Sequence, residues 1–207
     1  MATTPMSKGV KMKVIEISSA KGGVGTTTVA CSIALALAKK SPDRVLLLDL
    51  SKNDDCTAVL GLGTNSTREN NHFNMTIKGL TRQEMKDTLS VGNYDFVVID
   101  AGMETTLQYG FGYPDLRVQV VRNEYMSLRA ETLSGRTDFG ACVVLYQKDN
   151  ALTAKDIQMV LRNNPTVFEI SPNVARSIDA GLLGTQGKHW EKWTSEFIEN
   201  HLFEVSK

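Results

Sequence analysis

Residues 13–40, KVIEISSAKGGVGTTTVACSIALALAKK, carry the strongest structural signal in this sequence. It opens with a short run of β-forming residues at 13–17 and continues through a glycine-rich loop. Alanine and leucine predominate at residues 27–40, a composition that favours a helix. The order of strand, glycine loop and helix is the context that a phosphate-binding loop requires.

The loop itself, KGGVGTTT at residues 21–28, predicts a nucleotide site. Glycines let backbone N–H groups turn inward around phosphate oxygens, and the following helix presents its free N–H groups to the same anion. The hydroxyl of Thr27 stands where a magnesium ligand is expected. The alternative is a glycine-rich turn that binds nothing. The predicted nucleotide-binding residues of the loop are Lys21, Gly22, Gly23, Val24, Gly25, Thr26, Thr27 and Thr28.

Further apolar runs predict the rest of the sheet. VLLLDL at 45–50 and YDFVVID at 94–100 are apolar around or up to an aspartate, which is typical of strands buried on both faces of a parallel sheet. Strands alternating with helices indicate an α/β fold, a doubly wound, mostly parallel sheet flanked by helices in a single domain. The other predicted strands lie at 117–121, 141–146 and 167–170, and the other predicted helices at 127–133, 153–162 and 173–183.

Composition bounds the possible functions. The 207 residues fit one domain, and 42% of them are hydrophobic, which is enough for a core. Because 23 basic residues balance 23 acidic ones, no overall field attracts nucleic acid or anionic membrane, and such binding needs a local patch.

Cysteine usage and hydropathy favour a cytoplasmic protein. Cys31, Cys56 and Cys142 show neither the spacing of a zinc site nor the even count of a disulfide framework. No stretch approaches the roughly 18 apolar residues of a membrane span, and the start of the chain lacks the apolar centre of a signal peptide. We therefore expect a cytoplasmic location without membrane insertion.

Three segments stand apart within the predicted domain, residues 1–207. Residues 1–12 are expected to form a flexible tail, and the polar segment 63–91 a variable insertion with one helix at 82–89. Residues 187–204 predict a final amphipathic helix that carries an aromatic stripe. This stripe suits either a partner surface or the body of the protein, and we favour the body because exposed apolar patches are rare. Its members are Trp190, Trp193, Phe197 and His201.

The loop resembles the deviant Walker motif KGGxGK[ST] of the ParA/MinD family of partitioning and positioning ATPases, with Lys21 as the signature lysine. The ordinary pattern GxxxxGK[ST] is not met, because Ala20 replaces the first glycine and Thr26 stands where the phosphate-binding lysine belongs. Loss of this lysine is also a feature of the degenerate actinobacterial and CpaE/TadZ-like branches. The resemblance implies a P-loop NTPase fold of the SIMIBI type that binds ATP or ADP with Mg²⁺. It also implies a nucleotide-sandwich homodimer in which Lys21 reaches the partner's phosphates.

Two aspartates match the family's metal-site motifs. Asp49 matches the first aspartate of the motif DxDPQ, whereas Ser51 replaces the second, which orients water. Asp100 in NYDFVVIDAG matches the Walker B carboxylate. The resemblance therefore implies a magnesium site at Thr27, Asp49 and Asp100, and leaves Asp49 and Lys21 as the catalytic candidates. With the lysine and the second aspartate lost, we expect weak or absent hydrolysis while nucleotide binding survives.

The segment SPNVARSIDAGLL, residues 171–183, resembles the family's nucleotide-base loop. On this match Pro172 and Asn173 are expected near the adenine. Arg176 falls where ParA relatives carry a DNA-contacting arginine, and Lys148 is a candidate to extend that patch. Ordinary solvated surface charge is the alternative for both cations.

Three functions stay open. A ParA-like switch would partition plasmid, phage or chromosomal DNA, binding DNA non-specifically at the nucleoid together with a ParB-like centromere-binding partner. A positioning scaffold of the TadZ, CpaE or MinD kind would place a polar or secretion machine, and a nucleotide-free structural dimer would use the fold only as a platform. We predict the first, because the chain is too short to hold the receiver-like domain that many pilus-positioning relatives carry before the P-loop. Membrane cycling of the MinD kind is not expected, because Glu191, Glu196, Glu199 and Glu204 match poorly the cationic face that a membrane helix needs.

Overall fold

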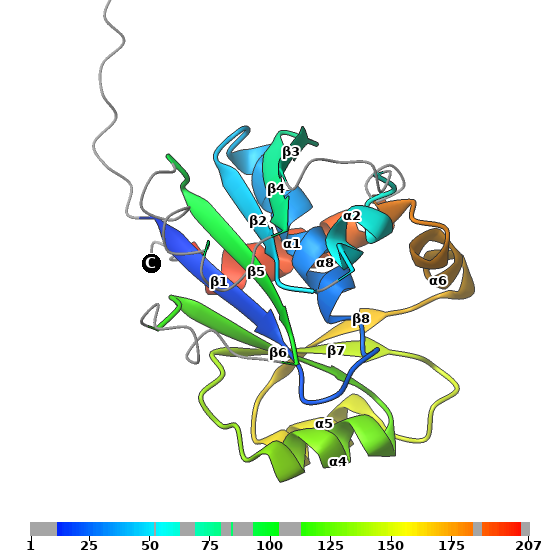
Figure 1. Cartoon of the computed structure of the whole chain (residues 1–207). Helices are drawn as coiled ribbons and strands as arrows, with labels where there is room; N and C mark the ends of the chain where they lie inside the picture. Colours follow the sequence, from blue (N-terminus) through cyan, green and yellow to red (C-terminus); the bar gives the residue numbers. More distant parts are fainter. Residues whose placement is uncertain are drawn as a thin grey trace, which may run out of the picture.

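The computed structural model describes residues 12–51, 53–62, 69–79, 84, 93–103, 113–183 and 188–203. Within these residues eight strands form one sheet in the order β3-β4-β2-β5-β1-β6-β7-β8 (Figure 1). Neighbouring strands from β4 to β8 run parallel, and β3 pairs antiparallel with β4 at one edge. The predicted doubly wound, mostly parallel α/β fold is confirmed.

The elements alternate along the chain as the apolar runs predict. The strands are β1 (Lys13–Ser18), β2 (Val45–Asp49), β3 (Glu69–His72), β4 (Met75–Gly79), β5 (Phe96–Gly102), β6 (Leu116–Arg122), β7 (Ala141–Tyr146) and β8 (Pro165–Glu169). The helices are α1 (Thr26–Lys40), α2 (Asp55–Val59), α4 (Tyr125–Ser134), α5 (Ala154–Leu161), α6 (Pro172–Asp179) and α8 (Lys188–His201).

The hairpin of β3 and β4 was not predicted. It lies inside the polar segment 63–91, where Met75 and Ile77 are the buried apolar residues among those that the structure describes. Two apolar positions are too few for a strand pattern, and the edge of the sheet supplies the pairing that stabilises them. Of the predicted helix at 82–89 only Glu84 is described, and nearly all of the predicted tail, 1–12, also lies outside the described residues.

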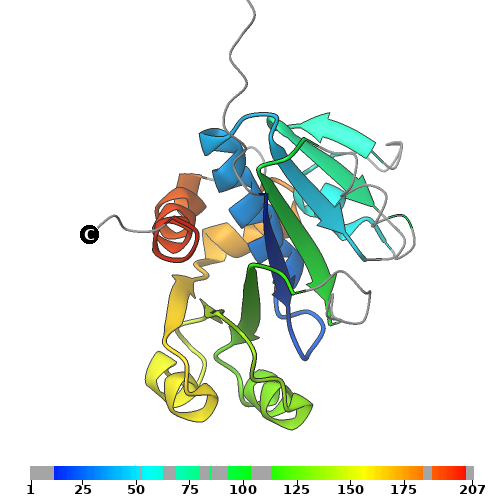
Figure 2. The same cartoon turned by 90° about the vertical axis from the view of Figure 1, so that its left-hand side faces the viewer.

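Both faces of the sheet are packed. In β2, Val45 and Leu47 join a large buried cluster with α1 and α8, whereas Leu46 and Leu48 join a cluster on the other face. This alternation explains why the run is apolar without interruption. Helices α4 and α5 lie together against β6, β7 and β8, away from α1 and α8 (Figure 2).

The last helix, α8, packs against the body of the protein through its aromatic stripe. Trp193 and Phe197 are buried, and the ring of Trp193 lies 4.8 Å from that of Phe168 in β8. Exposed ion pairs also join Lys39 and Lys40 of α1 to Glu191 and Glu199 of α8. Packing of the stripe on the body is therefore confirmed for Trp193 and Phe197, while the side chain of Trp190 lies outside the described part. None of the described helices combines the length and hydropathy needed to span a bilayer.

The sheet topology also locates the site. Strand β1 lies between β5 and β6. From β1 the chain passes to β2 on one side of the sheet, and from β6 it continues to β7 and β8 on the other side. Open α/β sheets bind ligands at such a switch point, beside the carboxyl ends of the strands. The glycine loop after β1, Asp49 at the end of β2 and Asp100 near the end of β5 all lie at this edge.

Candidate functional site

The glycine loop joins β1 to α1 and requires glycine at two positions. Gly23 and Gly25 have positive φ angles of 75° and 101°, which L side chains rarely adopt. A Cβ on Gly25 would lie 2.3 Å from Cδ1 of Leu145 in β7. Gly25 is also the N-cap of α1. The loop therefore ends at a helix N-terminus, whose backbone N–H groups have no partner within the helix and can bind an anion.

The side chain of Thr26, which occupies the lysine position, points into the interior of the loop. Its side chain is buried, and its hydroxyl lies 2.9 Å from the hydroxyl of Ser19. The Ser19 hydroxyl in turn lies 3.0 Å from the carbonyl oxygen of Lys21, to which it donates. Thr26 therefore ties the two ends of the loop together instead of presenting a cation.

A buried carboxylate of α4, that of Glu131, binds the backbone where the loop begins. Glu131 accepts a hydrogen bond from the backbone N–H of Ala20. Its other oxygen accepts from the side-chain amide of Gln119 at 2.9 Å and lies 3.6 Å from the guanidinium of Arg136. Because Glu131 is almost fully buried and has several donors, it fixes where the loop leaves β1.

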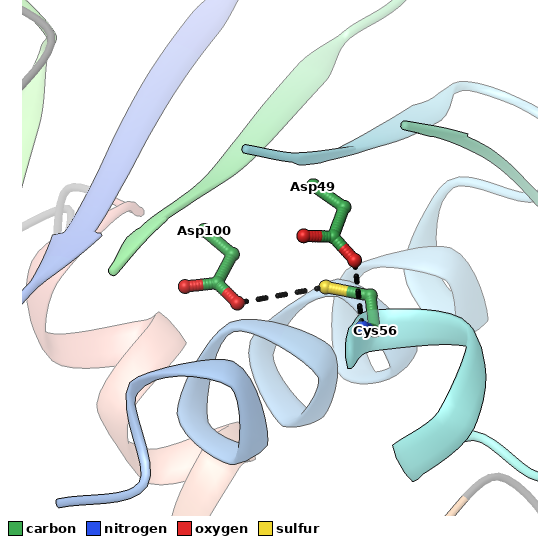
Figure 3. Close-up of side chains that lie close together, drawn as sticks. All are labelled: Asp49, Cys56 and Asp100. Atoms are coloured by element: carbon green, nitrogen blue, oxygen red, sulfur yellow. Dashed lines mark hydrogen bonds between the residues drawn. The ribbon is translucent and has the colours of Figure 1, made fainter. Parts of the chain in front are cut away.

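Two buried aspartates lie side by side at the same edge, and Cys56 contacts both of them (Figure 3). Asp49 and Asp100 are register partners, and ligand atoms of the two aspartates and Cys56 lie within 4.8 Å of one another. Asp49 accepts backbone N–H bonds from Ser51 at 2.8 Å and from Cys56 at 2.7 Å. Asp100 accepts from the N–H of Gly102 at 3.2 Å and from the Cys56 thiol at 3.7 Å.

The chemistry of this cluster fits a hydrated magnesium ion. Burial raises the pKa of Asp100 to about 6, with a smaller contribution from Asp49, while a hydrogen bond from Thr27 opposes the shift. A hydrogen bond with Cys31 and burial hold the pKa of Cys56 well above its ordinary value, so the thiol keeps its proton and acts as a donor. Two carboxylates and a hydroxyl are the oxygen ligands that Mg²⁺ prefers, and a cation would offset their buried charge. The magnesium role of Thr27, Asp49 and Asp100 stays a prediction.

We expect Asp100→Asn to stabilise the metal-free protein in a pH-dependent way. The pKa of Asp100 is raised from 3.8 to about 6 in the folded state, so the wild type loses stability relative to the variant as pH rises through this window. The difference should be near zero at about pH 4 and reach at most about 3 kcal/mol above about pH 7. Urea unfolding in the presence of a chelator, across this range, measures it.

Asp156→Asn is the matched control for this prediction. Hydrogen bonds from Thr153 lower the pKa of Asp156 at the start of α5, so removing its charge should cost stability at neutral pH. An Asp100→Asn protein less stable than the wild type at about pH 8 would contradict the argument.

The loop opens onto a cavity of about 350 Å³. The P-loop side contributes Gly23, Gly25 and Thr27, and apolar residues come from the ends of β7 and β8 and from α6, namely Leu145, Ile170 and Ile178. The volume is in the range of small-molecule sites, and the lining offers N–H donors together with an apolar surface. A larger cavity of about 570 Å³ borders α4 and α5, but its described lining includes none of the loop glycines. The smaller cavity is therefore the candidate nucleotide site.

Comparisons with known proteins agree with this geometry. Residues 12–98 match the model of an AAA domain family. Over 57 residues, 28% of this chain and 21% of the relative, the chain is 40% identical to the chromosome partitioning protein ParA of Caulobacter vibrioides. The chain is similar to ParA/MinD-family P-loop proteins over part of its length. The matched segment spans only about a fifth of the length of the curated relative.

Solved structures share the fold of this chain. A ParA family ATPase from Chlorobium tepidum superposes with a TM-score of 0.71 at 17% identity, over 89% of this chain and 98% of that one. The MinD protein of Pyrococcus horikoshii, solved with Mg-ADP, has a TM-score of 0.71 at 17% identity, over 95% and 100% of the two chains. The fold is therefore common to partition and positioning proteins and does not separate them.

The structure places the predicted ParA/MinD-type loop residues unequally. Gly23, Gly25, Thr27 and Thr28 line the cavity, whereas Val24 is buried in the core. Gly22 is exposed, and Lys21 is half-buried and is not among the described lining residues. Their roles toward a nucleotide stay predictions.

The predicted base and DNA residues lie on or near α6. Pro172 and Asn173 begin the helix and are exposed, while Ala175, Ile178 and Asp179 of the same helix line the cavity. Arg176 is exposed on α6, and Lys148 is exposed just after β7. Helix α6 reaches the cavity through residues other than Pro172 and Asn173, whose role toward a base stays a prediction.

Sequence reasoning missed Cys56 and Arg122 at this site. Asp55 and Arg122 line the cavity, and Cys56 lies in the aspartate cluster. A signal existed for Arg122, because it closes the apolar run of β6 at the edge where ligands bind. No sequence pattern distinguishes Cys56 from an ordinary small residue of α2.

Proposed function

We propose that this chain is a ParA-like, ATP-binding dimeric switch for the partition of plasmid, phage or chromosomal DNA, with weak or absent ATPase activity. The observation that carries the proposal is the P-loop cavity beside the paired buried carboxylates Asp49 and Asp100. The similarity to a ParA protein supports the partition role. The packing of α8 against the body supports DNA rather than a membrane as the surface, because the apolar face of this helix is already covered.

The proposed switch assigns a task to each part of the cavity. Backbone N–H groups of the loop and of the first turn of α1 bind the phosphates, and Thr27, Asp49 and Asp100 hold the hydrated Mg²⁺. Leu145 and Ile178 pack against the base. When bound, Mg²⁺ neutralises phosphate charge. Lys21 would contact the phosphates of a second copy in the homodimer, which is consistent with its place outside the described lining of its own cavity.

We expect negligible steady-state ATP hydrolysis by the isolated protein. Ser51 stands at the water-orienting position, and its hydroxyl accepts the backbone N–H of Asp55 at 3.0 Å, which ties it to the start of α2. Phosphate release measures turnover, which should be far below the roughly 1 to 100 per second of typical kinases. Turnover in that range would contradict this, and Asp55→Asn would then test whether the carboxylate of Asp55, which lines the cavity, orients the water.

We expect weak, salt-sensitive binding of duplex DNA without sequence preference, dependent on ATP. If a dimer neutralises about four phosphates, log affinity should fall with log salt with a slope near −3.6. Arg176→Ala, which changes both subunits, should reduce that slope by up to about two units. Fluorescence anisotropy across salt, with and without ATP, measures both effects.

Arg129→Ala is the matched control for DNA binding. It removes one exposed arginine from α4, which covers the face of the sheet away from α1, and should leave the slope unchanged. A slope unchanged by Arg176→Ala would place the DNA patch elsewhere. No binding at low salt would contradict the DNA-partition proposal, with its location at the nucleoid and its ParB-like partner, and favour a positioning scaffold.

A further inference from the structure

The cavity lacks the loop lysine, so its phosphate charge must be neutralised by another group. Thr26 holds the lysine position and is turned toward Ser19. Among the described residues that line the cavity, one is a cation, Arg122, and two are acids, Asp55 and Asp179. Among the described residues of the cavity lining, Arg122 is therefore the side chain whose charge is opposite to that of a nucleotide's phosphates.

The backbone of Arg122 is rigidly placed beside the loop. Arg122 is the last residue of β6, which pairs with β1, and its N–H donates to the hydroxyl of Ser127 at 3.0 Å. The next residue, Asn123, is fully buried, and its side-chain amide donates to the carbonyl of Gln147 at 2.8 Å and of Leu152 at 3.1 Å. The strand end is thus held from both sides, which positions the arginine before any ligand arrives.

The guanidinium of Arg122 is weakly engaged. Its Nη1 lies 3.5 Å from the carboxylate of Glu124, and both side chains are about a third exposed, so the ion pair contributes little. Its Nε is buried and has no hydrogen-bond partner among the described groups. An unsatisfied buried N–H is unfavourable, and a phosphate oxygen would satisfy it. The planar guanidinium matches phosphate with two parallel hydrogen bonds.

We propose that Arg122 binds the nucleotide phosphates within its own chain and takes over the charge that the P-loop lysine supplies elsewhere. This rests on the proposed nucleotide binding and deepens it, because the cation comes from the end of β6 instead of from the loop. A consequence is that a single chain binds nucleotide phosphates without waiting for Lys21 of a second copy.

Calorimetry with Mg-ADP on the full chain tests the assignment. Arg122→Ala should weaken Mg-ADP roughly 10- to 100-fold, the loss expected for a charge-assisted contact. Arg122→Lys should restore part of the affinity, and Arg129→Ala should leave it unchanged. Adenosine, titrated by NMR, should bind wild type and Arg122→Ala equally, because it carries no phosphate. If Arg122→Ala does not fold, Arg122→Gln replaces it, and the same loss of Mg-ADP affinity is expected.

A second background separates a phosphate contact from a structural role. In a Thr26→Lys protein the loop already carries a cation, so Arg122→Ala should weaken Mg-ADP less than about threefold there. Equal losses in both backgrounds, or a parallel loss of adenosine binding, would overturn the assignment. Wild-type protein that binds neither Mg-ADP nor adenosine overturns the proposed function itself, whereas normal Mg-ADP binding by Arg122→Ala overturns only the role of Arg122.

Discussion

Gly25→Ala is expected to abolish nucleotide binding and to destabilise the fold by about 2 to 5 kcal/mol. The φ angle of 101° is unfavourable for alanine, and the added Cβ would lie 2.3 Å from Leu145, a buried side chain of β7. Relief requires the loop to move off the strand, and the N–H groups at the start of α1 move with it. Urea unfolding measures the stability, and calorimetry with Mg-ADP measures the binding.

Gly23→Ala is the matched control, because it changes the same loop without the collision. Its φ of 75° strains alanine, but no heavy atom lies within 4 Å of the added Cβ. It should lose only about 1 kcal/mol. If the two substitutions destabilise the protein equally, the contact with Leu145 is not what requires glycine at position 25.

Thr26→Lys is expected to give the largest increase in nucleotide affinity. A lysine here places an ammonium group beside the phosphates, which should tighten Mg-ATP roughly 10- to 100-fold in calorimetry. The nucleotide-free protein should lose about 1 kcal/mol or more, because the hydrogen bond to Ser19 disappears and a cation enters a site that is 8% exposed. Affinity and stability should therefore change in opposite senses.

Thr26→Met separates charge from size in this experiment. Methionine has a similar length and also breaks the bond to Ser19, but it carries no cation. It should lose stability without tightening Mg-ATP. Equal affinities of the methionine and lysine variants would show that the missing charge at position 26 does not limit binding.

Elements that depend on local pattern can be predicted from the amino-acid sequence alone. The order of β1, glycine loop and α1 follows from residues 13–40, because strand, turn and helix preferences there act over a few neighbours. The uninterrupted runs of β2 and β5 likewise indicate strands buried on both faces, and their aspartates lie at the expected edge. The hairpin of β3 and β4 escaped prediction because Met75 and Ile77 are a weak signal without the neighbouring strand β2.

The side chains that share the cavity are brought together by the tertiary fold. Cys56 of α2 meets Asp49 and Asp100 because β2 and β5 are neighbours in the sheet, and Arg122 shares the cavity with the loop because β6 lies beside β1. Thr26 meets Ser19 only when the loop closes on itself. Local pattern specifies that strands form but not their order in the sheet, and that order brings residues far apart in the chain to one carboxyl edge.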